Sequence, residues 1–501
     1  MVMSVYFNDH SIEADHGRRS LRAGAVVVGA RVLLTFIQVL TFFVLARLLS
    51  PEDYGLVAMV TAITVFAPLL VGLGTPDAVV QCVRITEKEI SALFWISAAV
   101  GCSAAVLMAA SGPLIARFYG EPRLTGIVQV SALTFVASAL SCQHNTLLRR
   151  AMKFRDLAAV EIGANLLSAG GAIAMAVYGF GYWALVLRPV LAMCFIASGC
   201  WLRCRWVPGR PAMSAGARKM LRQGLYCAGF SVTDYIAGSS DRIAIGYWSG
   251  SIPLGYYQNA MFIYENLCAL LFSSSHNVAI AGLGKAQNSL DELRRLWRKA
   301  LSTLAFYAMP AFGILAVTGQ DLIPVLFGSQ WSHSGVLVSI LALRGIPHAV
   351  ERTSGWLHVV AGRADRWMRW GLVAMCGQLI ALFCGLPYGP AGVATAFVVY
   401  SFIMFIPAIA YSGAAVGIRA IDVIRVVWRP QTGALLAAAI GFTLRFTLLD
   451  HTSPILRIIT LALAYAAAYV TVVIGLLGER MPIQVILALI RDLPKRNRRA
   501  P

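Results

Sequence analysis

Residues 23–49 read AGAVVVGARVLLTFIQVLTFFVLARLL and carry only two charged side chains, Arg31 and Arg47. A helix needs about 20 mainly apolar residues to cross the roughly 30 Å hydrocarbon core of a bilayer. This stretch is longer than that and has no small-residue cleavage site after it. It therefore predicts a membrane-spanning helix that is retained, because the apolar region of a signal peptide is only about 7–15 residues long.

The composition extends this interpretation to most of the chain. Of the 501 residues, 58% are hydrophobic and 13% are charged, and the mean hydropathy is +0.71. Soluble domains use about 25% charged residues to cover their surface. These values exclude a soluble globular protein, a disordered chain and a disulfide-rich scaffold, and they predict a protein embedded in a bilayer along most of its length.

Similar apolar stretches recur and predict an all-α polytopic membrane protein of about fourteen spans. The expected spans lie near 23–49, 56–74, 91–115, 125–148, 158–178, 182–202, 221–248, 254–282, 300–318, 335–360, 367–386, 391–412, 431–449 and 454–477. About twelve spans is the alternative, because short loops such as residues 179–181 separate adjacent spans weakly.

The chain repeats itself weakly at the turns between spans. SPEDYG at 50–55 corresponds to SIPLGY at 251–256, and YGFG at 178–181 corresponds to YGP at 388–390. Six spans per repeat would give two like-oriented lobes around a central cavity, as in many transporters, with the last two spans outside the repeat.

This repeat predicts the following domain organisation. The segments are a cytoplasmic tail (1–22), a first six-helix lobe (23–202), a cytoplasmic linker (203–220), a second six-helix lobe (221–412), a second cytoplasmic linker (413–430), two extra helices (431–477) and a basic cytoplasmic tail (478–501).

The positions of Lys and Arg predict that both termini lie in the cytoplasm. Most of these 42 residues fall in the two terminal tails and in six alternate loops, whereas the intervening loops carry only Arg117 and Arg123. Cytoplasmic loops are enriched in Lys and Arg. The net charge of +19 is therefore dispersed along the membrane surface, where it suits anionic lipids, and we expect no nucleic acid as a partner.

Ionisable residues inside the spans are the candidate site residues. Each costs at least ~2.5–3.5 kcal/mol at bilayer depth unless it faces water or a partner. The candidates for binding an anionic substrate are Arg31, Arg242 and Arg344, and the candidates for coupling to an ion gradient are Asp234, Asp241 and Glu265. The alternative is ion pairing between helices. Four histidines could relay protons, but a single helix His more often packs: His144, His276, His348 and His358.

Motifs for known catalytic chemistry are missing from the sequence. It has no P-loop, GxSxG, HExxH or Cys/His metal spacing, so we expect no catalytic residues, no metal and no cofactor. One enzymatic alternative is a glycosyltransferase with a lipid-linked donor, in which Glu52 and Asp53 of the first external loop would act. The longest expected external segment, 319–334, is short for such a site, and these two acids also fit a helix start after Pro51.

Residues 45–56, LARLLSPEDYGL, resemble the signature of Wzx-type polysaccharide flippases of the multidrug/oligosaccharidyl-lipid/polysaccharide exporter superfamily. LLRRAMKFR at 147–155, GFGYWAL at 179–185, DRIAIG at 241–246 and GYY at 255–257 are similar to the same group. The matches follow in the right order over residues 20–415, and the later part of the second half matches more weakly.

The resemblance implies a fourteen-helix flippase in the bacterial inner membrane. Such a protein moves an undecaprenyl-diphosphate-linked oligosaccharide between leaflets by alternating access, for exopolysaccharide, capsule or lipopolysaccharide assembly. Its partners would be this substrate, membrane lipids and other polysaccharide assembly proteins. The resemblance also implies that the first, second, seventh and eighth spans line the portal of the cavity. Four of the candidates lie in these spans and therefore rank above the others: Arg31, Asp241, Arg242 and Glu265. A cation-coupled small-molecule antiporter of the same superfamily is the alternative; the excess of Arg over carboxylates argues against it.

Overall fold

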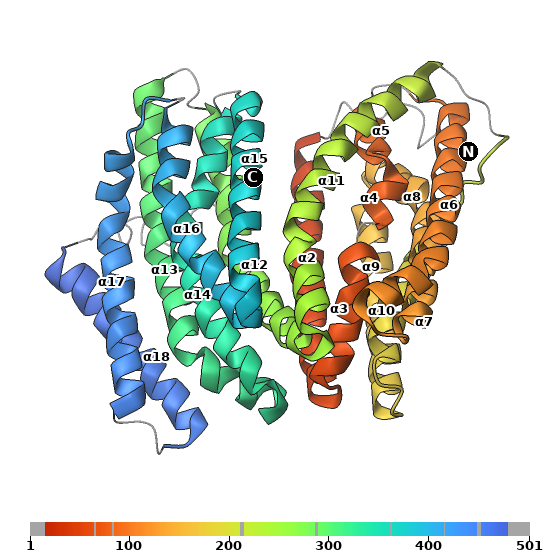
Figure 1. Cartoon of the computed structure of the whole chain (residues 1–501). Coiled ribbons are helices and arrows are strands. Elements are labelled where there is room, and N and C mark those ends of the chain that lie inside the picture. The colour runs from red at the N-terminus through yellow and green to blue at the C-terminus, as the bar shows by residue number, and fades with distance from the viewer. Residues whose placement is uncertain are drawn as a thin grey trace. The chain divides into compact units, whose positions relative to one another are not determined.

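The computed structural model describes residues 16–64, 67–82, 85–210, 215–285, 289–360, 363–414, 416–447 and 452–478. Helices are the only regular structure in these ranges, as the sequence predicts. Nine helical segments of the described chain are long and apolar enough to cross a membrane. The protein is therefore an all-α, multi-pass membrane protein. It divides into two compact units, residues 1–255 and 256–501 (Figure 1).

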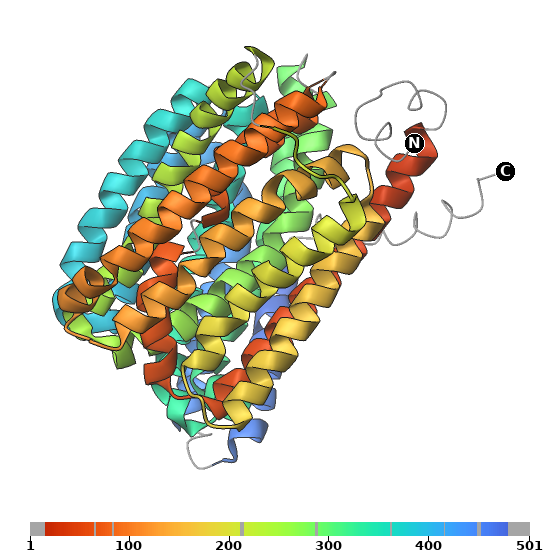
Figure 2. The same cartoon turned by 90° about the vertical axis from the view of Figure 1, so that its right-hand side faces the viewer.

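The first unit is a bundle whose long helices run side by side (Figure 2). Helix α2 packs along α9, and α10 packs on both α8 and α9. Its helices are α2 (His16–Leu48), α3 (Pro51–Thr64), α4 (Ala67–Gly72), α5 (Thr75–Gln81), α6 (Glu87–Tyr119), α7 (Leu124–Ser131), α8 (Leu133–Arg150), α9 (Phe154–Val177), α10 (Trp183–Cys204) and α11 (Ala215–Ser249).

The second unit is built around α14, which packs between α13 and α16. Helices α17 and α18 pack on α13 from another side. The helices are α12 (Ser251–Lys285), which begins in the first unit, α13 (Leu290–Phe327), η1 (Ser329–Trp331), α14 (Ser332–Val360), α15 (Ala364–Gly385), η2 (Leu386–Tyr388), α16 (Gly389–Gly413), α17 (Ala420–Thr447), α18 (Pro454–Val470) and η3 (Thr471–Leu476).

The span expected over 56–74 is covered by α3, which ends at Thr64, and by α4. Helix α4 ends at Gly72 and α5 begins at Thr75, and both residues between them have positive φ angles, 47° at Leu73 and 65° at Gly74. Such angles end a right-handed helix. Pro76 then starts the next helix, because its missing N–H has no partner to lose in a first turn.

The expectation of a loop over 319–334 is wrong. Helix α13 continues to Phe327 and α14 begins at Ser332. Asp321, the charged residue in this segment, is buried between two arginines of α17 and α18. An ion-paired carboxylate can stay inside a helical bundle, so its charge does not mark a loop here.

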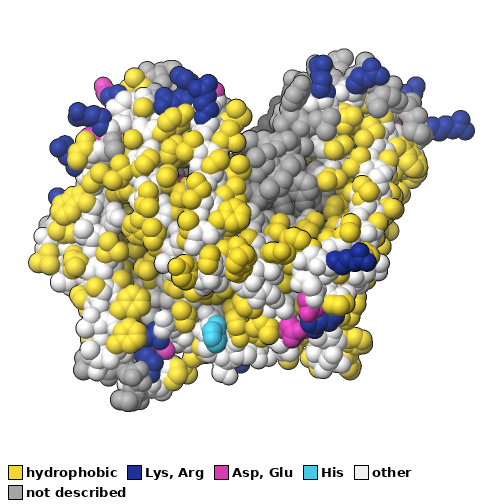
Figure 3. All heavy atoms as spheres, viewed as in Figure 1, with side chains coloured by type: hydrophobic (Ala, Val, Ile, Leu, Met, Phe, Trp, Pro, Cys, Tyr) yellow, Lys and Arg dark blue, Asp and Glu magenta, His cyan; other side chains and the backbone are white. Residues whose placement is uncertain are grey.

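The outer faces of both units are apolar. On α6, Val106, Leu107 and Leu114 are each about two-thirds exposed. Figure 3 shows hydrophobic side chains over the flanks of each unit and Lys and Arg side chains mainly at one end of each. Large exposed apolar faces are unfavourable in water and typical of helices that contact lipid.

Candidate substrate site

Four ionisable residues form a polar stripe on α14: Arg344, His348, Glu351 and Arg352. Spacings of four, seven and eight residues place them on one face of the helix. Arg344 lies about 18 Å from the start of a helix about 44 Å long, which places it close to the middle. A charged group at that depth must contact water, a ligand or polar protein groups.

Two neutral side chains of α16 orient Arg344. Its Nε donates a hydrogen bond to the Ser401 hydroxyl oxygen at 3.2 Å. Its Cζ atom lies 5.1 Å from the centre of the Phe397 ring, which provides a cation–π contact. Ser401 and Phe397 are both buried. These two contacts help to fix the direction of the guanidinium group.

His348 joins α14 to α12. Its Nδ1 and the Tyr264 hydroxyl share a hydrogen bond of 2.8 Å, and the Cys268 sulfur lies 3.9 Å from the same nitrogen. The Phe272 ring meets the imidazole edge to face at 5.7 Å between centres. These contacts fit the packing interpretation of this histidine, and they hold two helices together beside Arg344.

The remaining members of the stripe differ in exposure. Glu351 is half-buried and forms no hydrogen bond or ion pair with the described part of the chain. Arg352 is exposed. The stripe itself carries two guanidinium groups and one carboxylate, and Glu265 of α12 follows the tyrosine that bonds His348.

Sequence reasoning missed Tyr264 and Ser401. Neither residue belongs to a motif, and each acts only through a partner 57 to 84 positions away. The four-residue spacing between Arg344 and His348 could have indicated that both lie on one face of a helix. This spacing does not identify which other helices pack against that face.

The other predicted site residues are distributed over both units. In the first unit, Arg31 is exposed on α2, and α11 carries buried Asp241 and half-buried Arg242. Asp241 Oδ1 accepts a hydrogen bond from the Arg242 backbone N–H at 2.8 Å. Glu265 is exposed on α12 in the second unit. Asp234 falls on α11, but its side chain lies outside the described residues.

The two repeated turns contact each other reciprocally within the first unit. A Cβ atom on Gly55 would collide with the carbonyl group of Ser251, and a Cβ atom on Gly255 would collide with the carbonyl group of Pro51. Both positions therefore require glycine, because the start of α3 and the start of α12 approach backbone to backbone.

The two acids of the first turn have structural partners. Asp53 accepts hydrogen bonds from the Ser50 backbone N–H at 2.9 Å and from its hydroxyl at 2.7 Å, which caps α3. Glu52 pairs with Arg123. Hydrogen bonds to Glu121 and Glu52 raise the pKa of Arg123, so this guanidinium stays charged. These contacts support the helix-start interpretation of Glu52 and Asp53.

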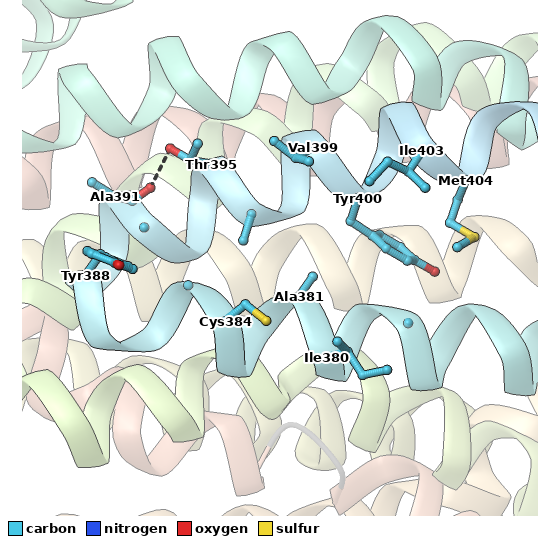
Figure 4. Close-up of a pocket in the computed structure, with 14 residues that line it drawn as sticks. Ile380, Ala381, Cys384, Tyr388, Ala391, Thr395, Val399, Tyr400, Ile403 and Met404 are labelled. Carbon is cyan, nitrogen blue, oxygen red and sulfur yellow. Dashed lines mark hydrogen bonds between the residues drawn. The ribbon is translucent and has the colours of Figure 1, made fainter.

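An apolar groove of about 730 Å³ runs between α15 and α16 in the second unit (Figure 4). Small residues, including Ala381 and Ala391, line it together with Ile380, Val399 and Ile403. Its lining carries no charged side chain, so it offers no cation to a phosphate group. The α14 stripe is the better candidate for a charged head group.

Long apolar helices define a multi-pass membrane protein, and the arginine near the middle of α14 marks a candidate site for a charged ligand. A family profile described as "Polysaccharide biosynthesis protein" matches residues 44–335, more than half of the chain. The chain belongs to this family, and the resemblance of the LARLLSPEDYGL stretch is confirmed.

Curated relatives and a solved structure agree with this placement. The chain is 26% identical to the teichuronic acid biosynthesis protein TuaB of Bacillus subtilis over 71% of this chain and 74% of that protein. It is 22% identical to the lipopolysaccharide biosynthesis protein WzxC of Escherichia coli over 67% and 69% of the two chains. The fold matches an inward closed structure of the lipid II flippase MurJ with a TM-score of 0.68, at 15% identity over 90% and 99% of the two chains.

Proposed function

We propose that this protein is a flippase that moves an undecaprenyl-diphosphate-linked oligosaccharide across the bacterial inner membrane for surface polysaccharide assembly. Membership in a polysaccharide biosynthesis family and a fold shared with a lipid II flippase support this proposal. In it the protein is a transporter rather than an enzyme, both termini are cytoplasmic, and its partners are this lipid-linked substrate, membrane lipids and other assembly proteins.

One observation carries the choice of an anionic, lipid-linked substrate. Arg344 lies near the middle of α14, where Ser401 and Phe397 contact its guanidinium group. A guanidinium group matches the oxygens of a phosphate in a forked geometry. The diphosphate would bind here while the polyprenyl chain stays in lipid, and Arg31 and Arg242 would add positive charge along its path.

Transport would proceed by alternating access. The proposed moving parts are the lobes 23–202 and 221–412, connected by residues 203–220, with the helices of 431–477 outside the repeat. Asp234, Asp241 and Glu265 are the proposed carriers of a coupling proton or sodium ion, because carboxylates in apolar surroundings can exchange protons near neutral pH.

The test is the leaflet on which lipid-linked repeat units accumulate. We expect cells with Arg344→Ala to accumulate them facing the cytoplasm and to lose surface polysaccharide, and Arg344→Lys to be only partly active. The matched control is Arg363→Ala, which removes an exposed arginine that pairs with Asp365 at 3.1 Å. Normal surface polysaccharide in Arg344→Ala cells with normal amounts of the protein would refute the site.

A further inference from the structure

A second cationic site lies in the second unit, between the first turns of α13 and α17. A cavity of about 430 Å³ is lined by four arginines, Arg294, Arg295, Arg298 and Arg425, together with Asp291 and Ser302. The site shares no residue with the α14 stripe. Its position near the helix ends distinguishes it from a group at membrane depth.

The length of α13 places this cavity in the headgroup layer. The helix has 38 residues and is about 57 Å long, whereas the hydrocarbon core is about 30 Å thick. Apart from the buried Asp321, its charged residues belong to its first turns, and the apolar part begins after Lys299. Trp428 is exposed on α17 one turn after Arg425, as tryptophans at the membrane interface often are.

Carboxylates only partly compensate the positive charge of the cavity. Arg294 contacts Asp291 at 3.2 Å and donates from Nε to the Val416 carbonyl at 2.9 Å. The pairs of Arg295 with Glu292 and of Arg298 with Asp422 are long, 3.8 Å each.

Arg425 forms no hydrogen bond or ion pair with the described residues. Asp291, the carboxylate in the lining, is 95% exposed and points toward solvent. The cavity therefore holds an excess of guanidinium groups with weak competing partners.

We propose that this cavity binds the phosphate of an anionic membrane phospholipid and thereby joins α17 to α13. Guanidinium groups from two helices can surround one phosphate, and the buried Ser302 offers a hydroxyl donor. Basic pockets between membrane helices on the cytoplasmic side suit such headgroups. The acyl chains of the lipid would lie against the apolar flank of the same helices.

Lipid retention by the purified full-length protein tests this proposal. Native mass spectrometry would compare added phosphatidylglycerol with zwitterionic phosphatidylcholine. We expect the wild-type protein to retain phosphatidylglycerol preferentially. Relative to the wild type, retention of this lipid should be about fivefold weaker in Arg425→Gln and about 25-fold weaker in the double variant that also carries Arg298→Gln. The control Arg419→Gln removes a nearby arginine that is 82% exposed and does not line the cavity, and retention there should be unchanged.

Three results would each overturn the proposal. The first is equal retention of both lipids, and the second is unchanged phosphatidylglycerol retention in the double variant. The third is that inorganic phosphate raises the melting temperature of the wild-type protein as much as phosphatidylglycerol does, with both effects lost in the double variant, because the ligand would then be free phosphate. Arg425→Lys serves as a second variant, because lysine keeps the positive charge but lacks the planar guanidinium group that can bind two phosphate oxygens at once. We expect its retention of phosphatidylglycerol to be intermediate. None of these measurements depends on transport.

Discussion

Arg344 carries its charge near the middle of α14, and two neutral side chains of α16 contact its guanidinium group. The Ser401 hydroxyl sets the direction of Nε, and the Phe397 ring covers one face of the guanidinium group. A hydrogen bond to a charged group contributes about 1.5–3 kcal/mol. At the residue scale, the function of Arg344 should therefore depend on α16 as well as on α14.

Ser401→Ala should slow transport about tenfold or more, because the guanidinium group loses the partner that orients it. The measurement is the initial rate of substrate transfer in reconstituted vesicles. Ser198→Ala is the matched control, since that hydroxyl only bonds the Cys194 carbonyl of its own helix at 2.9 Å. Equal rates in both variants would show that Ser401 does not position Arg344.

Gly255→Ala should lower the melting temperature of the protein. The new methyl group would collide with the Pro51 carbonyl, and overpacking of this kind costs about 1–3 kcal/mol. Gly163→Ala is the control, because no atom beyond its own helix lies within 4 Å of the added carbon. A thermal unfolding curve for each variant decides the question, and an unchanged melting temperature in Gly255→Ala would contradict the close approach.

At the element scale, Asp321 connects α13 to the two helices after the second lobe. Its carboxylate contacts Arg445 of α17 at 3.1 Å and Arg457 of α18 at 3.2 Å. All three side chains are nearly buried. Two consecutive helices, α17 and α18, therefore share one carboxylate of α13, which lies more than 120 residues earlier in the chain.

Asp321→Asn should be strongly destabilising, by about 3–5 kcal/mol, because it removes the negative charge that two nearly buried guanidinium groups contact. Asp365→Asn removes an exposed carboxylate that pairs with Arg363 and should change the melting temperature little. A smaller loss of thermal stability in Asp321→Asn than in Asp365→Asn would contradict this role.

Sequence reasoning predicted the helices better than their interruptions. An apolar run such as 91–115 identifies a span because an α-helix satisfies all of its backbone hydrogen bonds internally and can therefore cross lipid. Helix α6 covers that run. The break at Leu73 and Gly74 coincides with the end of the span expected over 56–74. The loop over 319–334 was wrongly expected because Asp321 pairs with arginines more than 120 positions away, which periodicity cannot reveal.

The sequence alone could predict the charged residue of the candidate site but not the residues that contact it. A charge inside an apolar run identifies Arg344 from the sequence alone. Tyr264 and Ser401 carry no such signal, because hydroxyl side chains are common in membrane helices and become informative only when the packing is known. Whether Arg31, Arg242 and Arg344 act on one substrate stays a prediction.

At the scale of the whole molecule, the distribution of Lys and Arg predicts the orientation in the membrane. In a variant without native cysteines, a membrane-impermeant maleimide should label Ser453→Cys in intact spheroplasts. It should label Met152→Cys, at an exposed position in a basic loop, only after lysis. The reverse pattern would invert the topology.

The most direct measurement of the proposed function is transfer of a fluorescent undecaprenyl-diphosphate-linked oligosaccharide in vesicles that contain only the purified protein. A membrane-impermeant quencher would report the fraction of head groups on the outer leaflet over time. The proposal predicts exchange between leaflets with the wild-type protein and at least tenfold slower exchange with Arg344→Ala. Exchange no faster than in protein-free vesicles, with correctly folded protein present, would contradict it.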